Sequence, residues 1–277
     1  MPLVRLGTTS WSLQPKDPQD LVRRVELAGL TGTQLALSPV VTQRDVWADT
    51  IPILLDAGIS VLGGMMQPVG EDYTSIESIA RTGGVRPDHT WSANEAMARA
   101  MAVLAHRAHI DIITMHAGFI PSDVNDPERS VMLNRIKLLV KIFTDQGVRL
   151  ALETGQESAS ALSQVLEEID HPMLGINFDP ANMLLYGSGD PMEAMALLAP
   201  SILSVHMKDA VASGQSGVWG KEMPLGEGDV DWNAFHALAA SLPQEMDAVI
   251  EREGGDQRIE DIVGAAHLVK GHIACMG

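Results

Sequence analysis

Residues Arg149–Glu153 read RLALE, a short apolar run that ends in an acid, and three similar runs follow it. Each run is short and apolar and is flanked by Gly, Pro or a helical pattern, as is typical of a buried parallel strand. The other three are Leu174–Asp179 (LGINFD), Ile202–His206 (ILSVH) and Ala248–Glu251 (AVIE). Their last residues are 26, 27 and 45 positions apart, and a strand–helix–strand unit needs about 25–35 residues. We therefore predict parallel strands joined by helices.

The same alternation extends over the whole chain, with eight strands and eight helices, which favours a closed barrel over an open sheet. The other predicted strands are Val4–Thr9, Gln34–Leu37, Ile59–Met66 and Ile110–His116. The predicted helices lie near Pro18–Ala28, Arg44–Asp56, Ala93–Ala108, Pro127–Gln146, Ala159–Ile169, Pro191–Leu198, Trp232–Ala240 and Ile259–Ile273. A length of 277 residues with 45% hydrophobic content suits one barrel of about 250 residues. We predict an α/β fold, a single (β/α)₈ TIM barrel domain over residues 1–277.

Two long connections interrupt this alternation. Residues Gln67–Thr90 are rich in Gly, Pro and charge, and we expect them to cross the mouth of the barrel. Residues Asp209–Asp231 contain the motif PLGEGDVD. Long loops that follow barrel strands more often cover an active site than act as linkers. The alternative for Asp209–Asp231 is a contact between subunits.

Composition restricts the partners and the compartment. The chain has 36 acids against 19 Lys and Arg, a net charge of −17, which disfavours nucleic acid and favours small-molecule partners. No run of 18 apolar residues predicts a membrane span, and Met1–Ser10 lacks the pattern of a secretory signal. Cys275 is the only cysteine, so no intrachain disulfide can form, and we expect a cytoplasmic protein.

Glu153, Asp179, His206 and Glu251 are the candidate functional residues with the strongest pattern. Each ends a predicted strand, and catalytic groups of a TIM barrel gather at the carboxyl ends of its strands. A single Glu at such a position is usually a solvated rim residue, whereas four in successive strands favour a shared site. Three carboxylates and one imidazole suit a divalent cation, with Mn²⁺, Mg²⁺, Co²⁺ and Zn²⁺ as candidates.

Other polar residues near these strand ends are candidate substrate contacts. His116 ends the fourth predicted strand and either meets a substrate hydroxyl, transfers a proton, or is a structural histidine bonded to a carboxylate. Lys208 and Glu253 lie two residues after His206 and Glu251, on the same side of their strands. Lys208 either holds a substrate oxygen or phosphate or pairs with a ligand carboxylate. Glu253 either orders the ligands or meets substrate.

Three further residues lie beside predicted strand ends. Gln156 and Glu157 follow Glu153 and are either polar substrate contacts or rim-loop residues. Trp11 follows the first strand and either forms an apolar wall for a sugar face or packs in the core.

The segments FDPANM, HMKD, PLGEGDVDW and IERE resemble the sugar phosphate isomerase/epimerase family of the xylose isomerase-like TIM barrel superfamily. The resemblance implies one divalent ion held by Glu153, Asp179, His206 and Glu251. It also implies that Glu153 and Glu251 transfer the substrate proton, through an enediolate of a small sugar or sugar phosphate. Epimerisation, isomerisation and dehydration by an inosose or keto-acid lyase all share this step. A barrel that binds metal without turnover is a further alternative.

Departures from related subgroups narrow the choice. The apurinic endonucleases of the superfamily have a histidine ligand where this chain has Asn182, so a trinuclear site is not expected, and Asn182 becomes a candidate substrate contact. The free-ketose 3-epimerases have a Glu and an Arg where this chain has Ala159 and Ala212, so their substrate contacts do not carry over. Members of the family are often homodimers or tetramers, but no stripe in this sequence identifies such a contact, so the oligomeric state stays open.

Overall fold

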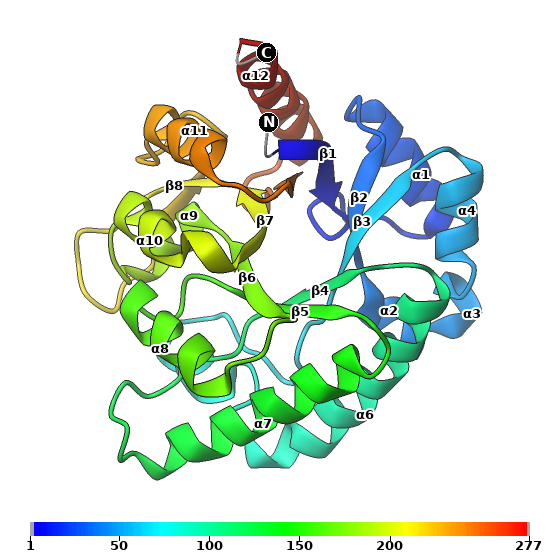
Figure 1. The fold of residues 1–277 in the computed structure, drawn as a ribbon. Helices are drawn as coiled ribbons and strands as arrows, with labels where there is room; N and C mark the ends of the chain where they lie inside the picture. The colour runs from blue at the N-terminus through cyan, green and yellow to red at the C-terminus, as the bar shows by residue number, and fades with distance from the viewer. Residues whose placement is uncertain (1–2, 276–277) are drawn as a thin grey trace.

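Eight parallel strands close into a barrel in the computed structural model, which describes residues 3–275 (Figure 1). The ends of the predicted range 1–277, and the first two residues of Met1–Ser10, lie outside the described residues, as does the side chain of Cys275. The ring order is β1, β10, β7, β6, β5, β4, β3, β2. The strands are β1 (Leu3–Thr9), β2 (Gly32–Ala36), β3 (Ser60–Met65), β4 (Ile112–Met115), β5 (Arg149–Glu153), β6 (Leu174–Phe178), β7 (Ile202–Met207) and β10 (Met246–Ile250). The predicted (β/α)₈ fold is confirmed.

Helices surround the barrel on its outside (Figure 1). They are α1 (Pro18–Leu27), α2 (Leu37–Thr42), α3 (Arg44–Trp47), α4 (Thr50–Asp56), α5 (Ile76–Thr82), α6 (Asp88–Arg107), α7 (Pro127–Thr144), α8 (Ala159–Ile169), α9 (Pro180–Tyr186), α10 (Pro191–Leu198), α11 (Trp232–Ser241) and α12 (Arg258–Cys275). A short 3₁₀ turn, η1 (Ala199–Ser201), precedes β7. Helix α12 packs on β1 and β10, where the first and last barrel strands pair.

Side chains alternate between the inside and the outside of the barrel along each strand. In β6 and β7 the inward set includes Asn177, Ser204 and His206, and Ser204 donates a hydrogen bond to Asn177 from the neighbouring strand. Between these positions lie buried Ile176, Phe178 and other apolar residues that belong to the core cluster. Strands β6 and β7 therefore present polar groups inward, below the carboxyl-end mouth.

The predicted helix Arg44–Asp56 is divided in the structure into α3 and α4, and α2 precedes them. Proline in a helix interior lacks a donor and clashes with the carbonyl four residues earlier. Pro52 would occupy such an interior position, whereas the break before Thr50 places it in the first turn of α4. Strand β2 also ends earlier than predicted, at Ala36, whose N–H donates to the Ser10 hydroxyl. Leu37 consequently begins α2.

Both long connections contain regular structure that the sequence pattern did not predict. Helix α5 lies within Gln67–Thr90. Gly84, in the same connection, has φ of +62°, and a β-carbon at this position would lie 2.0 Å from the carbonyl oxygen of Ala117, so only glycine fits there. Asp209–Asp231 contains an antiparallel pair, β8 (Asp209–Val211) and β9 (Lys221–Met223). Across the described residues, no helix is both long enough and apolar enough to cross a membrane.

Candidate metal centre

The four strand-end residues meet at one point in the mouth of the barrel. Glu153 is the last residue of β5, Asp179 follows β6, His206 lies in β7 and Glu251 follows β10. One ligand atom from each lies within 4.8 Å of the corresponding atoms of the others, and all four side chains are buried. Parallel strands of a closed barrel end at the same rim, which is why residues up to 98 positions apart converge.

His206 presents one ring nitrogen to the three carboxylates. Its Nδ1 lies 3.5 Å from Glu153 Oε1, 3.6 Å from Asp179 Oδ2 and 3.3 Å from Glu251 Oε2. The other nitrogen, Nε2, lies 2.8 Å from the side-chain oxygen of Gln34 in β2. With Nε2 as the donor to Gln34, the lone pair of Nδ1 faces the carboxylates, as a ligand nitrogen requires.

Each carboxylate is oriented by neighbouring donors. Asn182 donates to Glu153 Oε1 at 2.9 Å, and Asn177 donates to Glu153 Oε2 at 3.2 Å. The backbone N–H of Asn182 donates to Asp179 Oδ1 at 3.0 Å, so Asp179 also caps the N-terminus of α9.

Glu251 is oriented by two side chains from other parts of the barrel. The indole N–H of Trp11 donates to Glu251 Oε1 at 2.7 Å, and Lys208 Nζ donates to Oε2 at 3.0 Å. Trp11 follows β1, and Lys208 follows β7. The half-buried Trp11 thus lies at the site, outside the apolar core cluster.

Burial and charge shift the pKa values of these groups in opposite directions. Burial works to raise the pKa of Glu251, but the charges of Lys208 and His206 outweigh burial and hold this pKa well below its usual range. Burial raises the pKa of Asp179, and the charge of Lys208 offsets only part of this effect. Burial works to lower the pKa of His206, but Glu153 and Glu251 raise it well above its ordinary value. Lys208 and a protonated His206 supply positive charge to the three carboxylates, and a cation bound at His206 Nδ1 would take the place of the histidine proton.

The donor set fits a metal ion. Asp179 Oδ2 and His206 Nδ1 are buried and have no hydrogen-bond partner among the described residues. Ligand atoms up to 4.8 Å apart can share an ion at about 2.0–2.5 Å from each, within the usual range for divalent cations. Buried polar atoms without partners are unfavourable unless a ligand satisfies them. This group of residues could hold a metal ion.

A pocket of about 340 Å³ opens above the four residues. Of the sequence-predicted contacts, Trp11, His116, Asn182, Lys208 and Glu253 line it, together with Glu153 and Glu251. The sequence pattern missed other lining residues, which come mainly from the two long connections and α9: Glu71, Tyr73, Leu185, Tyr186, Trp219 and Glu222. Residues in loops show no hydrophobic periodicity, so the sequence pattern could not single them out. The predicted position of both loops near the mouth did indicate that some of their residues would line the site.

His116, Gln156 and Glu157 lie on one side of this pocket. His116 Nε2 is 3.4 Å from Glu153 Oε1, so His116 borders the cluster. Gln156 and Glu157 are buried but are not among the residues that line the pocket. Gln156 donates to the hydroxyl of Tyr186, a lining residue, at 3.3 Å. The structure therefore places Gln156 behind the wall of the pocket, as a support for Tyr186.

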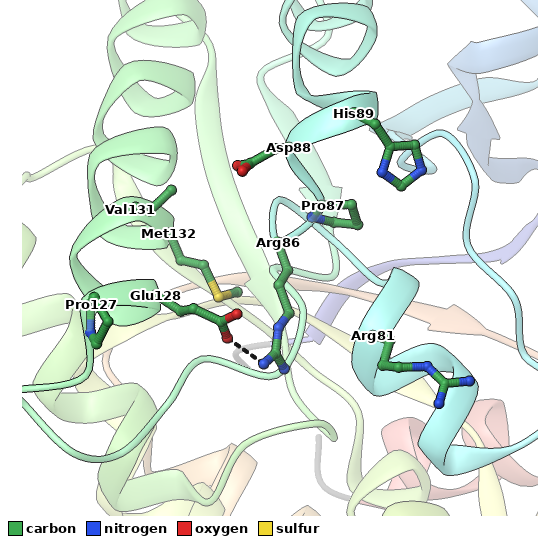
Figure 2. A pocket seen from close by; sticks show the side chains of 9 residues that line it. All are labelled: Arg81, Arg86, Pro87, Asp88, His89, Pro127, Glu128, Val131 and Met132. Carbon is green, nitrogen blue, oxygen red and sulfur yellow. Dashed lines mark hydrogen bonds and ion pairs between the residues drawn. The ribbon is translucent and has the colours of Figure 1, made fainter.

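A second pocket, of about 470 Å³, lies between α5, the start of α6 and the start of α7 (Figure 2). Although it is larger, it contains no group of clustered ligand residues. Its charged residues are paired with each other or with neighbours: Arg86 with Glu128, Arg81 with Glu77, and Asp88 with Arg135. The smaller pocket at the barrel mouth is the stronger candidate site, because it holds the buried cluster with unsatisfied atoms.

The protein is a closed eight-stranded barrel with a buried cluster of three carboxylates and one histidine at the carboxyl ends of its strands. These features define the class of TIM barrels whose mouth could hold a metal ion. Within this class, the chain belongs to the xylose isomerase-like TIM barrel family, whose model matches residues 24–269. The match confirms the resemblance seen in FDPANM, HMKD, PLGEGDVDW and IERE.

Comparison with individual proteins shows similarity to several members of this superfamily. The crystal structure of a xylose isomerase domain protein from Planctomyces limnophilus is 32% identical, with a TM-score of 0.85 and 91% of each chain covered. A 3-oxo-isoapionate decarboxylase of Pectobacterium atrosepticum is 26% identical over 47% of this chain and 48% of its own length. A 3-dehydroshikimate dehydratase of Bacillus anthracis is 30% identical over 39% of this chain and 40% of its own length. The chain thus matches less than half the length of either curated relative. Solved structures of an L-ribulose 3-epimerase, 14% identical, and of a D-tagatose 3-epimerase-like protein, 17% identical, share the fold.

Proposed function

We propose that this protein is a divalent-metal-dependent isomerase or epimerase of a small polyhydroxy carbonyl compound, acting through an enediolate of the substrate. One observation carries the proposal: two carboxylates of a single buried cluster, Glu153 and Glu251, approach the pocket from different sides. Their strands, β5 and β10, are separated in the ring by β6 and β7. An L-ribulose 3-epimerase and a D-allulose 3-epimerase share this fold, and a metal site in the mouth fits the removal of a proton next to a sugar carbonyl.

The cluster would hold a divalent ion through Glu153, Asp179, His206 and Glu251. A cation held there would supply positive charge to stabilise the negative charge that a substrate carbonyl develops when the neighbouring C–H bond breaks. The candidates are Mn²⁺, Mg²⁺, Co²⁺ and Zn²⁺, all of which accept oxygen and imidazole ligands.

Glu153 and Glu251 are suited to move the substrate proton. Burial opposes ionisation of Glu153, but the charges of His206 and His116 outweigh it and lower the pKa of Glu153. Both glutamates are therefore ionised at neutral pH and ready to accept a proton. Trp11 and Asn182 hold their oxygens by hydrogen bonds, which restricts their rotation. One glutamate takes the proton from one face, and the other returns it to the opposite face.

His116 and Lys208 complete the polar wall. His116 lies against Glu153 and is placed to meet a substrate hydroxyl or to pass on its proton. Lys208 neutralises Glu251 and Glu253. Glu253, whose side chain is 51% exposed, reaches solvent at the rim of the pocket. Asn182 bridges Glu153 and Lys208, so it positions both residues.

Proton exchange measured by NMR in D₂O tests this proposal. The protein is stripped of metal, reloaded with Mg²⁺, and incubated with ketoses, ketose phosphates, inososes and keto-sugar acids. We expect deuterium to enter the carbon next to the carbonyl and a new isomer to form. Glu153→Gln and Glu251→Gln should each slow this exchange by about 100-fold or more when metal is bound. Glu167→Gln, on the exposed face of α8, serves as the matched control. Full exchange by both glutamine variants would overturn the proposed roles.

A lyase is the second candidate, because the two curated relatives are named as a decarboxylase and a dehydratase. Removal of the same proton can be followed by loss of a hydroxyl group from the next carbon. In the same experiment, a product that has lost water would assign the protein to this class. Deuterium exchange accompanied by an isomer that keeps all the oxygen atoms of the substrate would exclude it.

A further inference from the structure

The pocket at the barrel mouth is lined by far more negative than positive side chains. Five of its lining residues are glutamates, and among the described residues Lys208 is the only lysine or arginine that lines it. The five are Glu71, Glu153, Glu222, Glu251 and Glu253. The guanidinium of Arg252 lies outside the lining and is paired with Asp261 and Glu222. A bound divalent ion would neutralise the charge of the buried cluster, which includes Glu153 and Glu251. It would not neutralise Glu71, Glu222 and Glu253, which lie outside that cluster.

Lys208 has no donor left for an anionic substrate. An ammonium group has three N–H donors. Lys208 Nζ donates to Glu253 Oε2 at 2.9 Å, to Glu251 Oε2 at 3.0 Å and to Asn182 Oδ1 at 3.3 Å. Its side chain is only 3% exposed. A phosphate or carboxylate could reach Lys208 only by displacing one of these partners.

The glycine-containing loop after β7 offers no anion site either. TIM barrels frequently bind phosphate through backbone N–H groups of the loops after strands seven and eight. Here the carboxylate of Asp209 already accepts from the N–H groups of Gly226 (2.8 Å), Gly228 (3.1 Å) and Val230 (3.2 Å). The indole of Trp232 also donates to Asp209, at 2.8 Å. An internal anion thus occupies the donors that a phosphate would need.

Aromatic side chains supply the remaining recognition surface. Trp11, Tyr73, Tyr186 and Trp219 line the pocket, and the rings of Tyr186 and Trp219 pack against each other with centroids 4.7 Å apart. Phe119 packs edge-on against Tyr186 from behind, at 5.7 Å. Aromatic faces beside carboxylates bind the C–H faces and hydroxyl groups of polyols, and neither group favours an added negative charge.

We infer that this pocket selects an uncharged polyhydroxy carbonyl compound and rejects substrates that carry a phosphate or carboxylate group. The inference rests on the proposed function and narrows it, since both sugar phosphates and keto acids would be excluded. A volume of about 340 Å³ lies at the lower end of ligand-pocket sizes, which fits a small molecule such as a monosaccharide. The hydroxyl groups of such a substrate would donate to Glu71, Glu222 and Glu253.

Matched substrate sets test this inference. One set is D-fructose, D-fructose 6-phosphate and D-fructuronate, which share a carbonyl group and differ in charge at one carbon. A second set is 3-keto-D-glucose with the corresponding 6-phosphate and 6-carboxylate. C–H exchange in D₂O and quenching of tryptophan fluorescence are measured for each with the Mg²⁺-loaded protein. We expect the neutral member of a set to bind and exchange with kcat/KM at least about tenfold above its anionic partners.

The two possible failures are distinguishable. Equal or faster exchange of an anionic member would overturn the neutral-substrate inference while supporting the proposed function. Absence of both binding and exchange in all members would overturn the proposed function, and the inference with it.

A charge-removing variant tests the cause of the selectivity. Glu253→Gln removes one rim charge and replaces the charged acceptor of Lys208 by a neutral amide oxygen, which accepts more weakly. We expect the preference for the neutral member to narrow by at least about threefold, because the anionic members meet one fewer negative charge and compete with a weaker acceptor for Lys208. Glu227→Gln is the control, since Glu227 is exposed in the same loop but does not line the pocket. If the ratio of kcat/KM between neutral and anionic substrates did not change in Glu253→Gln, or if it fell equally in Glu227→Gln, the charge of Glu253 would not be the cause of the selectivity.

Discussion

Gln34 accepts a hydrogen bond from His206 across the barrel, with 2.8 Å between Gln34 Oε1 and His206 Nε2. The two residues are 172 positions apart in the sequence. Gln34 is itself held by a weak contact of its amide nitrogen with the hydroxyl of Thr114, at 3.4 Å. This bond selects the tautomer of His206 that leaves the lone pair of Nδ1 free toward the carboxylates. Gln34 therefore orients a candidate metal ligand without being a ligand itself.

Replacement of Gln34 by leucine should weaken metal binding without unfolding the barrel. Loss of the partner that orients a ligand histidine typically lowers metal affinity about 10–100-fold. Competition between the protein and a chelator measures the affinity for Mn²⁺. Gln43→Leu, at an exposed position before α3, is the control. Equal affinity in the Gln34→Leu and wild-type proteins would show that the hydrogen bond does not orient the ligand.

Replacement of Asp179 by asparagine should separate metal binding from folding. Asparagine keeps an oxygen for the cap of α9, where Asp179 Oδ1 now accepts from the N–H of Asn182. It removes one of three clustered negative charges. We expect the metal-dependent increase in melting temperature to disappear, while the metal-free variant melts at the same temperature as metal-free wild type or higher. Metal analysis and thermal unfolding with and without Mn²⁺ measure both effects, and an increase retained in full would exclude Asp179 as a ligand.

Glu157 should make the folded state less stable as the pH rises. Burial raises the pKa of Glu157 from 4.5 to about 7, although the charge of His116 opposes the shift. The folded protein then holds a proton that the unfolded chain releases above pH 4.5. The stability from this proton is complete below pH 4.5 and is lost as the pH rises through about 7.

Urea unfolding at pH 5 and pH 8 measures this effect. We expect Glu157→Gln to remove a pH-dependent difference on the order of 1–3 kcal/mol, since glutamine does not ionise. The variant should therefore gain stability relative to wild type at pH 8. Glu167→Gln, exposed on α8, should leave the difference unchanged. Parallel pH profiles for wild type and Glu157→Gln would refute the assignment.

Asp209 should anchor the loop that carries Trp219 and Glu222 to the pocket. Its buried carboxylate accepts from four backbone N–H groups, three of them in the loop, and from one indole N–H. Asp209→Asn replaces one acceptor oxygen by a donor that faces these N–H groups. We expect the free energy of unfolding to fall by roughly 1.5–3 kcal/mol, the usual range for hydrogen bonds to a charged group.

Limited proteolysis between residues 209 and 231 provides a second measurement for Asp209. Cleavage should become faster in Asp209→Asn, because the loop has lost its central acceptor. Asp229→Asn is the control, as Asp229 is exposed in the same loop and, within residues 3–275, its carboxylate accepts only from the N–H of Ala212. If wild type, Asp209→Asn and Asp229→Asn were cleaved at the same rate, Asp209 would not be the anchor.

The sequence alone was sufficient to predict the barrel and the meeting of its four candidate ligands. Short apolar strands at a spacing suited to parallel pairing end at a common rim, so their last residues must converge once the sheet closes. The side-chain period of two also predicted that Lys208 shares the inward side of His206, and that Glu253 shares the side of Glu251. In the structure, Lys208 contacts both Glu251 and Glu253.

Only the tertiary structure placed Gln34, Trp11 and the walls of the pocket. Gln34 reaches His206 because closure of the ring brings β2 and β7 together inside the barrel with only β1 and β10 between them, a relationship that no local pattern contains. Tyr73 and Trp219 come from connections without strand or helix periodicity. Their positions depend on the close packing of Gly84 against Ala117 and on the backbone N–H groups that donate to Asp209. Local periodicity determines which residues end a strand, whereas long-range closure and loop anchoring determine which side chains surround them.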